Sequence, residues 1–226
     1  MVTDAISDYF FTTSEVANQN LKKAGVPDSK IFFVGNIMID TLKKNIKNFI
    51  KPSLFDENKL RAGNYLVITL HRPSNVDQPD NLNYLLIEIV SNCRGLPLIF
   101  PVHPRTKKTL EKIGFRHPLV ILTDPLSYLQ FNYLVKNAKA VITDSGGVQE
   151  ETTVMEVPCI TMRNNTERPE TIAIGSNVLV GDDMILLKKE LDILFENKWK
   201  KGNIPKLWDG RTAERIIAIL EKIEWN

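Results

Sequence analysis

The stretch that decides the fold is Lys139-Ala-Val-Ile-Thr-Asp-Ser-Gly-Gly-Val-Gln-Glu-Glu151. Its apolar, β-branched start predicts a buried strand, and residues 148–155 predict a helix. A strand, a Ser-Gly-Gly turn and a helix start bring backbone N–H groups and the positive end of a helix dipole to one point. Such a point favours an anion, usually a phosphate, and Gly146 and Gly147 would let it approach the backbone. A turn that uses glycine only for its geometry fits the same residues, so the rest of the chain must decide.

From Asn64 onward, strand-like and helix-like segments alternate with short connections. The strand candidates are compact apolar runs with little alternation, as expected when both faces of a parallel sheet are covered. They are residues 65–70, 97–102, 119–122, 140–143, 158–162 and 177–180. Helical stretches lie between them, and the one at 81–90 carries its apolar residues in a single stripe. This order predicts an α/β fold with a Rossmann-type parallel sheet.

The segment 1–50 differs in kind from the rest. Two apolar strands, 9–13 and 31–34, flank a helix that ends near Gly25, and a second helix is expected at 37–49. Two such strands cannot bury both faces or satisfy their edges alone. They either join the main sheet or form the tail of a domain whose beginning is absent, and the second alternative is favoured.

Polar residues stand at the carboxyl ends of five predicted strands, where open parallel α/β sheets bind ligands. Each residue alone would more often be solvated or would cap a neighbour. Five ends that converge on one rim are harder to dismiss, and they predict a binding site. The ends are His71-Arg72, His103, Asp124, Asp144-Ser145 and Arg163.

Side chains near this rim suit a nucleotide. Arg72, Arg163 and Arg168 can each pair with phosphate oxygens in a bidentate manner. Glu151, one turn into its helix, can accept hydrogen bonds from a ribose diol, although an exposed helical Glu fits equally well. His117 precedes a strand, on the opposite rim, and is assigned no role.

Composition narrows the class of protein. The chain has 226 residues, 43% of them hydrophobic and 25% charged, as in ordinary globular proteins. A net charge of +2 is too small to predict nucleic-acid binding. No apolar run approaches the ~18–20 residues of a membrane span, and the first residues do not show a signal-peptide pattern. Cys93 and Cys159 are far apart and lack metal-ligand spacing, so we expect buried free thiols in a reducing cytoplasm. No metal and no cofactor are expected.

With these residues identified, the chain resembles the non-hydrolysing UDP-N-acetylglucosamine 2-epimerases. The resemblance covers almost the whole chain, in the family's order and spacing. Ser-Gly-Gly-x-Gln-Glu-Glu together with Thr-Glu-Arg-Pro-Glu is a highly specific combination. The matching blocks are 69–77, 101–104, 124–131, 143–151, 163–170 and 209–215.

The resemblance implies a glycosyltransferase-B-like architecture, in which two Rossmann-type domains face each other across a cleft. It also implies interconversion of UDP-GlcNAc and UDP-ManNAc. In the family mechanism the C2 proton is removed while UDP leaves C1, which gives 2-acetamidoglucal. UDP re-adds after a proton returns on the opposite face.

The resemblance also implies residue roles. Ser145, Gly146 and Gly147 would hold the diphosphate and Glu151 the ribose. His71 matches a histidine that the family needs for activity and is the catalytic candidate. The other expected UDP-side residues are Arg72, His103, Leu126, Phe131 and Arg168, with Leu126 and Phe131 lining the uracil pocket and Arg168 reaching the phosphates.

The chain departs from the family in one respect. Members carry a complete N-terminal domain before the segment that begins here with Asp8-Tyr-Phe-Phe-Thr12, and that domain supplies the acidic residues that move the C2 proton. We therefore expect 1–52 to be a remnant of that domain with a linker, 53–206 to be the UDP-binding domain, and 207–226 to be a helix that packs toward the N-terminal domain. Asp209 is expected to be the N-cap of this last helix.

Three interpretations stay open. The first is an epimerase piece that binds UDP, is inactive alone, and needs the missing domain or a complementing chain, with a homodimer as the full-length form. The second is a non-catalytic UDP-binding module or fragment. The third is a related UDP-sugar glycosyltransferase. None of them involves a nucleic acid or a membrane.

Overall fold

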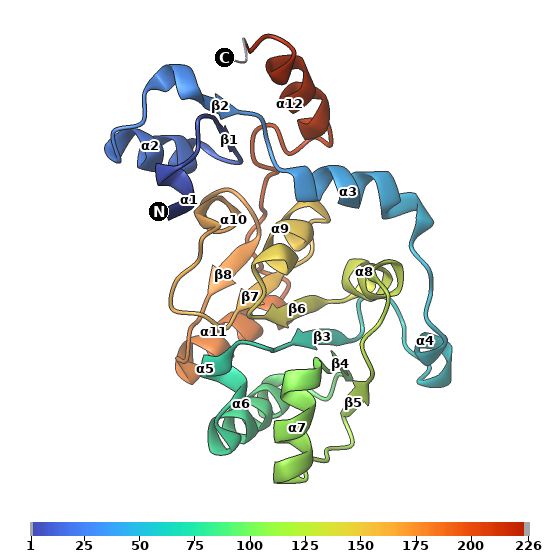
Figure 1. Ribbon diagram of the computed structural model, residues 1–226. Helices are drawn as coiled ribbons and strands as arrows, with labels where there is room; N and C mark the ends of the chain where they lie inside the picture. The colour runs from blue at the N-terminus through green and yellow to red at the C-terminus, as the bar shows by residue number, and fades with distance from the viewer. Residues whose placement is uncertain (1, 224–226) are drawn as a thin grey trace. The chain divides into compact units, whose positions relative to one another are not determined.

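The computed structural model describes residues 2–223, which divide into two compact units (Figure 1). The larger unit runs from Asn48 to Asn203. The smaller one combines the residues up to Lys47 with those from Ile204 onward. Every residue predicted for the site belongs to the larger unit.

The larger unit contains six strands: β3 (Leu66–Thr69), β4 (Leu98–Pro101), β5 (Val120–Thr123), β6 (Ala140–Thr143), β7 (Cys159–Thr161) and β8 (Asn177–Leu179). They form one sheet in the order β5-β4-β3-β6-β7-β8, and every neighbouring pair is parallel. All six predicted strands are confirmed, and so is the α/β fold with a parallel sheet.

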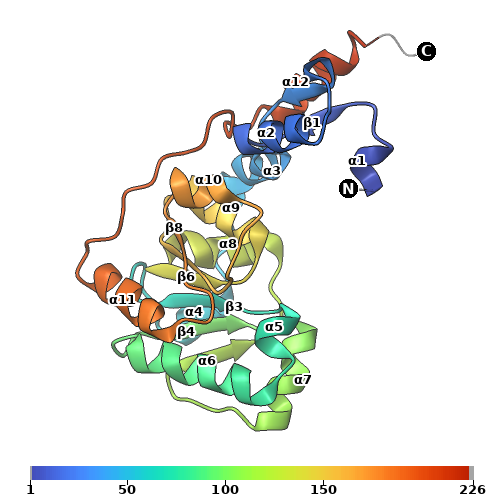
Figure 2. The same cartoon turned by 90° about the vertical axis from the view of Figure 1, so that its left-hand side faces the viewer.

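The helices of this unit are α4 (Ser53–Glu57), α5 (Pro73–Val76), α6 (Pro79–Asn92), α7 (Pro104–Ile113), α8 (Tyr128–Asn137), α9 (Gly146–Val154), α10 (Pro169–Ala173) and α11 (Met184–Phe195). Successive residues of a strand point to opposite faces of the sheet. Leu66 and Ile68 accordingly pack in one core cluster with residues of α6 and α11, whereas Val67 packs in a second cluster with residues of α8 and α9. Figure 2 shows α6 and α8 on opposite sides of the sheet. Coverage of both faces explains why the strands are apolar throughout.

The chain reverses its progress across the sheet between β3 and β6. After β3 it places β4 and β5 on one side, and it then returns to place β6, β7 and β8 on the other. β3 and β6 are paired from Leu66 opposite Ala140 to Thr69 opposite Thr143. Beyond the carboxyl ends of such a neighbouring pair lies the crevice in which open α/β sheets bind ligands.

The smaller unit contains α1 (Val2–Ala5), β1 (Phe10–Thr12), α2 (Glu15–Lys23), β2 (Ile31–Phe33), α3 (Ile37–Asn45) and α12 (Thr212–Leu220). β1 and β2 pair in parallel as a two-stranded sheet of their own and do not join the main sheet. Trp208 is buried and donates a hydrogen bond from Nε1 to the Thr13 carbonyl oxygen, at 3.0 Å. This bond ties the segment before α12 to the strand region.

The predicted N-cap of the last helix is wrong. Arg211 occupies the N-cap position and makes no capping bond with its side chain. The carboxylate of Asp40 caps the helix instead, because it accepts hydrogen bonds from the backbone N–H groups of Thr212 (3.1 Å) and Ala213 (2.8 Å). Asp209 forms an ion pair with Arg215. A carboxylate distant in sequence replaces the local cap, which a local pattern cannot reveal.

Candidate functional site

The predicted site residues meet where β3 and β6 end side by side (Figure 1). His71 and Arg72 follow β3, and Ser145 follows β6 as the N-cap of α9. His103 follows the next strand, β4, and is the N-cap of α7. Three of the five predicted strand ends thus deliver these residues to one rim of the sheet.

The carboxylate of Asp144 accepts several hydrogen bonds at this rim. Its side chain has no solvent exposure. Its Oδ2 accepts hydrogen bonds from the backbone N–H of His71 (3.0 Å), the backbone N–H of Arg72 (2.9 Å) and the Asn75 amide (3.0 Å). Burial alone would raise the pKa of the Asp144 carboxyl, but the hydrogen bonds from His71, Arg72 and Asn75 outweigh burial and lower it. Asp144 therefore holds the loop after β3 against the end of β6.

The same carboxylate orients His71. Nδ1 of His71 lies 3.0 Å from Oδ1 of Asp144, so Nε2 is the ring nitrogen left to meet a ligand. The rings of His71 and His103 are 5.7 Å apart between centroids. The Nδ1 atom of His103 accepts a hydrogen bond from the Arg105 backbone N–H, at 3.2 Å. A histidine held by a buried carboxylate is suited to proton transfer. Sequence reasoning placed Asp144 on the rim but did not assign it this role.

The start of α9 has the features of an anion site. Ser145 makes no side-chain cap, so its hydroxyl does not take the first N–H groups of the helix. A Cβ atom added at Gly146 or Gly147 would meet no protein atom within 4 Å. The backbone thus borders open space at the positive end of the helix dipole.

Three consecutive polar residues of α9 are buried, and each has a different partner. Gln149 donates from Nε2 to the Ser145 carbonyl oxygen (3.2 Å), and its Oε1 accepts from the Thr166 hydroxyl (2.7 Å). Glu150 forms an ion pair with Nε of Arg168. Glu151 accepts a hydrogen bond from the hydroxyl of Tyr128, at 2.8 Å. The Gln-Glu-Glu motif therefore connects α9 to the loop before α10 and to α8.

The three arginines of the rim differ in burial. Arg163 is only 7% exposed, and its guanidinium donates to both carboxylate oxygens of Glu167, at 2.7 and 2.8 Å. Hydrogen bonds from Arg163 are the main reason that the pKa of Glu167 falls to about 2. Arg72 lies farther away, with its Nη2 3.8 Å from Oε1 of Glu167. Arg163 thus organises its own loop, whereas Arg72 and Arg168 keep partly exposed side chains.

Glu151 is a buried carboxylate, 5% exposed, and not the exposed helical Glu of the alternative interpretation. Burial is the main reason that its pKa is raised; the Tyr128 hydrogen bond opposes this shift, and the nearby charge of Glu150 adds to it. Leu126 and Phe131 are partly buried and pack against the core cluster on the α8 and α9 face. The expected uracil-side and ribose-side residues therefore lie on the same face of the sheet.

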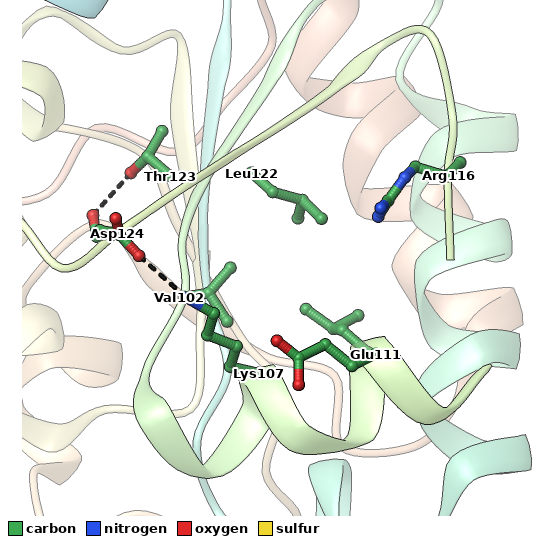
Figure 3. Close-up of a pocket in the computed structure, with 8 residues that line it drawn as sticks. Val102, Lys107, Glu111, Arg116, Leu122, Thr123 and Asp124 are labelled. Carbon is green, nitrogen blue, oxygen red and sulfur yellow. Dashed lines mark hydrogen bonds and ion pairs between the residues drawn. The ribbon is translucent and has the colours of Figure 1, made fainter. Parts of the chain in front are cut away.

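A cavity of about 290 Å³ lies at the edge of the sheet, between β5 and α7 (Figure 3). Lys107 and Asp124 form an ion pair across it, with Nζ 3.2 Å from Oδ1, and Thr123 donates to the Asp124 carbonyl oxygen (Figure 3). Of the five strand ends, only that of Asp124 contributes to this cavity. The edge cavity is therefore separate from the rim formed by β3 and β6.

Two further findings concern residues 2–223 alone. This part of the chain contains no group of three or more His, Cys, Asp or Glu side chains placed to hold a metal ion. Its helices are too short or too polar to span a bilayer.

Comparison with known proteins places these residues in a family context. Residues 1–221 match the family model described as UDP-N-acetylglucosamine 2-epimerase. The UDP-N-acetylglucosamine 2-epimerase of Methanocaldococcus jannaschii is 40% identical over 238 residues, which cover 97% of this chain and 62% of that protein. A Pseudomonas aeruginosa protein, UDP-2,3-diacetamido-2,3-dideoxy-D-glucuronate 2-epimerase, is 36% identical, with 99% of this chain and 62% of that protein covered.

The solved structures agree with this comparison. The crystal structure of the Methanocaldococcus jannaschii UDP-GlcNAc 2-epimerase in complex with UDP-GlcNAc and UDP matches with a TM-score of 0.85 and 38% identity. The match covers 98% of this chain and 63% of that one. The chain thus spans 62% of the length of the curated relatives named above.

Proposed function

Since the chain belongs to the UDP-N-acetylglucosamine 2-epimerase family, we propose that it binds UDP-sugars and takes part in interconverting UDP-GlcNAc and UDP-ManNAc. One observation carries the proposal: the His71–Asp144 pair joins the end of β3 to the end of β6, the strand that leads into α9. An oriented imidazole beside an anion-binding helix start suits the departure of a diphosphate from a sugar.

In this proposal, different residues bind the diphosphate, the ribose and the uracil of the UDP-sugar. The backbone N–H groups at Ser145, Gly146 and Gly147 hold the diphosphate, and Arg72 and Arg168 add charge-assisted hydrogen bonds. Glu151 accepts from the ribose, and the uracil packs near Phe131 and Leu126. The burial of Glu151 and the open space at the two glycines support this assignment.

The proposed chemistry is an elimination followed by an addition. A base takes the C2 proton, the C1–O bond breaks, UDP leaves with the bonding electron pair, and a C1=C2 double bond forms. His71, held at Nδ1 by Asp144, stabilises or protonates the departing diphosphate from Nε2. Re-addition of UDP after a proton returns to the opposite face of C2 gives the epimer.

The residues that move the C2 proton are proposed to come from another domain or chain. The carboxylates of the rim that lie nearest His71 and the start of α9 already have partners. Asp144 serves His71, Glu150 pairs with Arg168, Glu151 accepts from Tyr128, and Glu167 is held by Arg163. We therefore expect this chain alone to bind UDP without turnover. We expect the complete enzyme to be a cytoplasmic homodimer.

A second substrate is supported by the Pseudomonas aeruginosa relative, whose name gives C2 epimerisation of a different UDP-sugar. Both candidates share the UDP half and differ in the sugar. UDP binding therefore tests what they have in common, and assays of the two UDP-sugars separate them.

The test is calorimetric titration of the purified chain with UDP. Saturable binding that is lost in Arg168→Ala and retained in Arg94→Ala supports the proposal, because Arg94 pairs with Asp192 away from the rim. Arg168→Lys, which keeps a positive charge beside Glu150, controls for loss of folding. Failure of the unaltered chain to bind UDP would contradict the proposal. Epimer formation from UDP-GlcNAc, followed by NMR, would contradict the expected inactivity of the chain alone.

A further inference from the structure

Tyr128 connects α8 to the buried carboxylate of α9. It is the first residue of α8, directly after the N-cap Ser127, which forms a capping box with Gln130. The capping box fixes the backbone from which Tyr128 projects. The tyrosine hydroxyl lies 2.8 Å from Oε1 of Glu151. Tyr128 is 37% exposed whereas Glu151 is 5% exposed, so a partly exposed hydroxyl-bearing side chain is hydrogen-bonded to a buried carboxylate.

The hydrogen bond from Tyr128 engages one of the two carboxylate oxygens of Glu151. An ionised carboxylate only accepts hydrogen bonds, and a phenol hydroxyl donates one. Tyr128 takes Oε1. It thereby selects one orientation of the carboxylate and favours its ionised form against the effect of burial. The other oxygen, Oε2, then has a defined direction.

We propose that Tyr128 is a positioning residue of the ribose subsite, whose hydroxyl holds Glu151 so that Oε2 accepts a hydrogen bond from a ribose hydroxyl of UDP. The inference rests on the proposed UDP-binding function and adds to it a residue on a different helix. Since Tyr128 acts through Glu151, its removal weakens the recognition of the ribose hydroxyl and leaves the contacts to the phosphates in place.

A purely structural role for Tyr128 makes a different prediction. If the hydrogen bond only braced α8 against α9, its loss would weaken UDP and its deoxy analogues equally. If the hydroxyl occupied the place of the ribose, its loss would tighten UDP binding. The decisive quantity is the ratio of the affinity for UDP to that for an analogue without one ribose hydroxyl.

The experiment measures that ratio by calorimetry for 2′-deoxy-UDP and 3′-deoxy-UDP. In the unaltered chain, the analogue lacking the recognised hydroxyl should bind about tenfold more weakly than UDP. In Tyr128→Phe, UDP itself should bind about tenfold more weakly, and the ratio should fall below about threefold. Glu151→Gln should also reduce the ratio. Tyr84→Phe, on the exposed side of α6, is the matched control and should leave the ratio unchanged.

Three results would overturn the inference. The first is a ratio in Tyr128→Phe equal to that of the unaltered chain, even if UDP affinity falls. The second is tighter UDP binding by that variant. The third is the absence of any ribose dependence in the unaltered chain while UDP still binds. Absence of UDP binding by the unaltered chain would instead contradict the proposed function itself, and the inference with it. Thermal melting of each variant establishes that it is folded.

Discussion

Nδ1 of His71 lies 3.0 Å from Oδ1 of Asp144, and the aspartate side chain has no contact with solvent. The two residues follow neighbouring strands, β3 and β6, and are 73 positions apart in sequence. The aspartate also receives the backbone N–H groups of His71 and Arg72. One carboxylate thus fixes both the loop that carries the histidine and the direction of its ring.

Asp144→Asn should destabilise the larger unit by about 2–3 kcal/mol at pH 7, because an amide replaces an acceptor oxygen by a donor facing other donors. It should also weaken UDP binding. The pKa of Asp144 is lowered in the folded state. The stability that this carboxylate contributes is therefore fully present above its ordinary pKa of about 3.9 and is lost as the pH falls through the lowered value.

Denaturant unfolding at several pH values checks this prediction. The difference in free energy of unfolding between the unaltered chain and Asp144→Asn should shrink as the pH falls from about 5 to about 3. Asp124→Asn alters a carboxylate that is 86% exposed and should change stability little. A difference that stays constant with pH would contradict the role given to Asp144.

Gly147→Ala should weaken UDP binding without lowering the stability of the fold. The space beside Gly147 is open, its backbone is not in the positive-φ region, and it lies in the first turn of α9. Alanine should therefore preserve or raise stability, by up to about 1 kcal/mol, while its methyl group hinders a diphosphate. Gly202→Ala is the contrast, since a Cβ atom there would lie 2.5 Å from the carbonyl carbon of Gly175. For Gly147→Ala the melting temperature should stay the same or rise while UDP affinity falls, and unchanged UDP affinity would count against the anion site.

Glu151→Gln should stabilise the fold at neutral pH, by about 1 kcal/mol. The carboxyl is buried, the charge of Glu150 lies on the same helix, and only the Tyr128 hydroxyl and the Asn132 amide oppose the rise in its pKa. Because the folded-state pKa is raised, ionised Glu151 destabilises the fold above that value, and the effect disappears as the pH falls below the ordinary value.

Unfolding at pH 7 and near pH 4 tests the sign of this effect. The increase in the free energy of unfolding caused by Glu151→Gln should be present at pH 7 and small near pH 4. The UDP affinity of this variant should fall. Glu111→Gln, which alters an exposed residue of α7, should show neither change. Lower stability of Glu151→Gln at pH 7 would mean that the hydrogen bond from Tyr128 outweighs the cost of burial.

Glu150→Gln should weaken UDP binding through Arg168. Glu150 holds Nε of that arginine, so its neutralisation frees the guanidinium from one orientation. We expect an approximately fivefold loss of UDP affinity, against a larger loss in Arg168→Ala. The double variant should bind no worse than Arg168→Ala alone, because both changes act on one contact. Additive losses would show that Glu150 acts elsewhere.

Sequence patterns were sufficient for the fold class and for the rim. Strand runs such as 140–143 are apolar throughout, and an apolar run between helical segments has few other structures available. The carboxyl ends of parallel strands share one edge, so His71, His103 and Ser145 could be grouped before any distance was measured. The cap of α12 could not be predicted, because the carboxylate that caps it, Asp40, is 172 residues from Thr212.

By itself, the sequence determined the order of strands and helices, the parallel sheet, and the residue types at the rim, because hydrophobic periodicity and turn residues act locally along the chain. Only the tertiary structure decided the pairing of His71 with Asp144, of Arg168 with Glu150, and of Tyr128 with Glu151. These pairs depend on which strands become neighbours and on which helix faces are buried. A buried carboxylate is stable only with a partner, and the fold, not the local pattern, selects that partner.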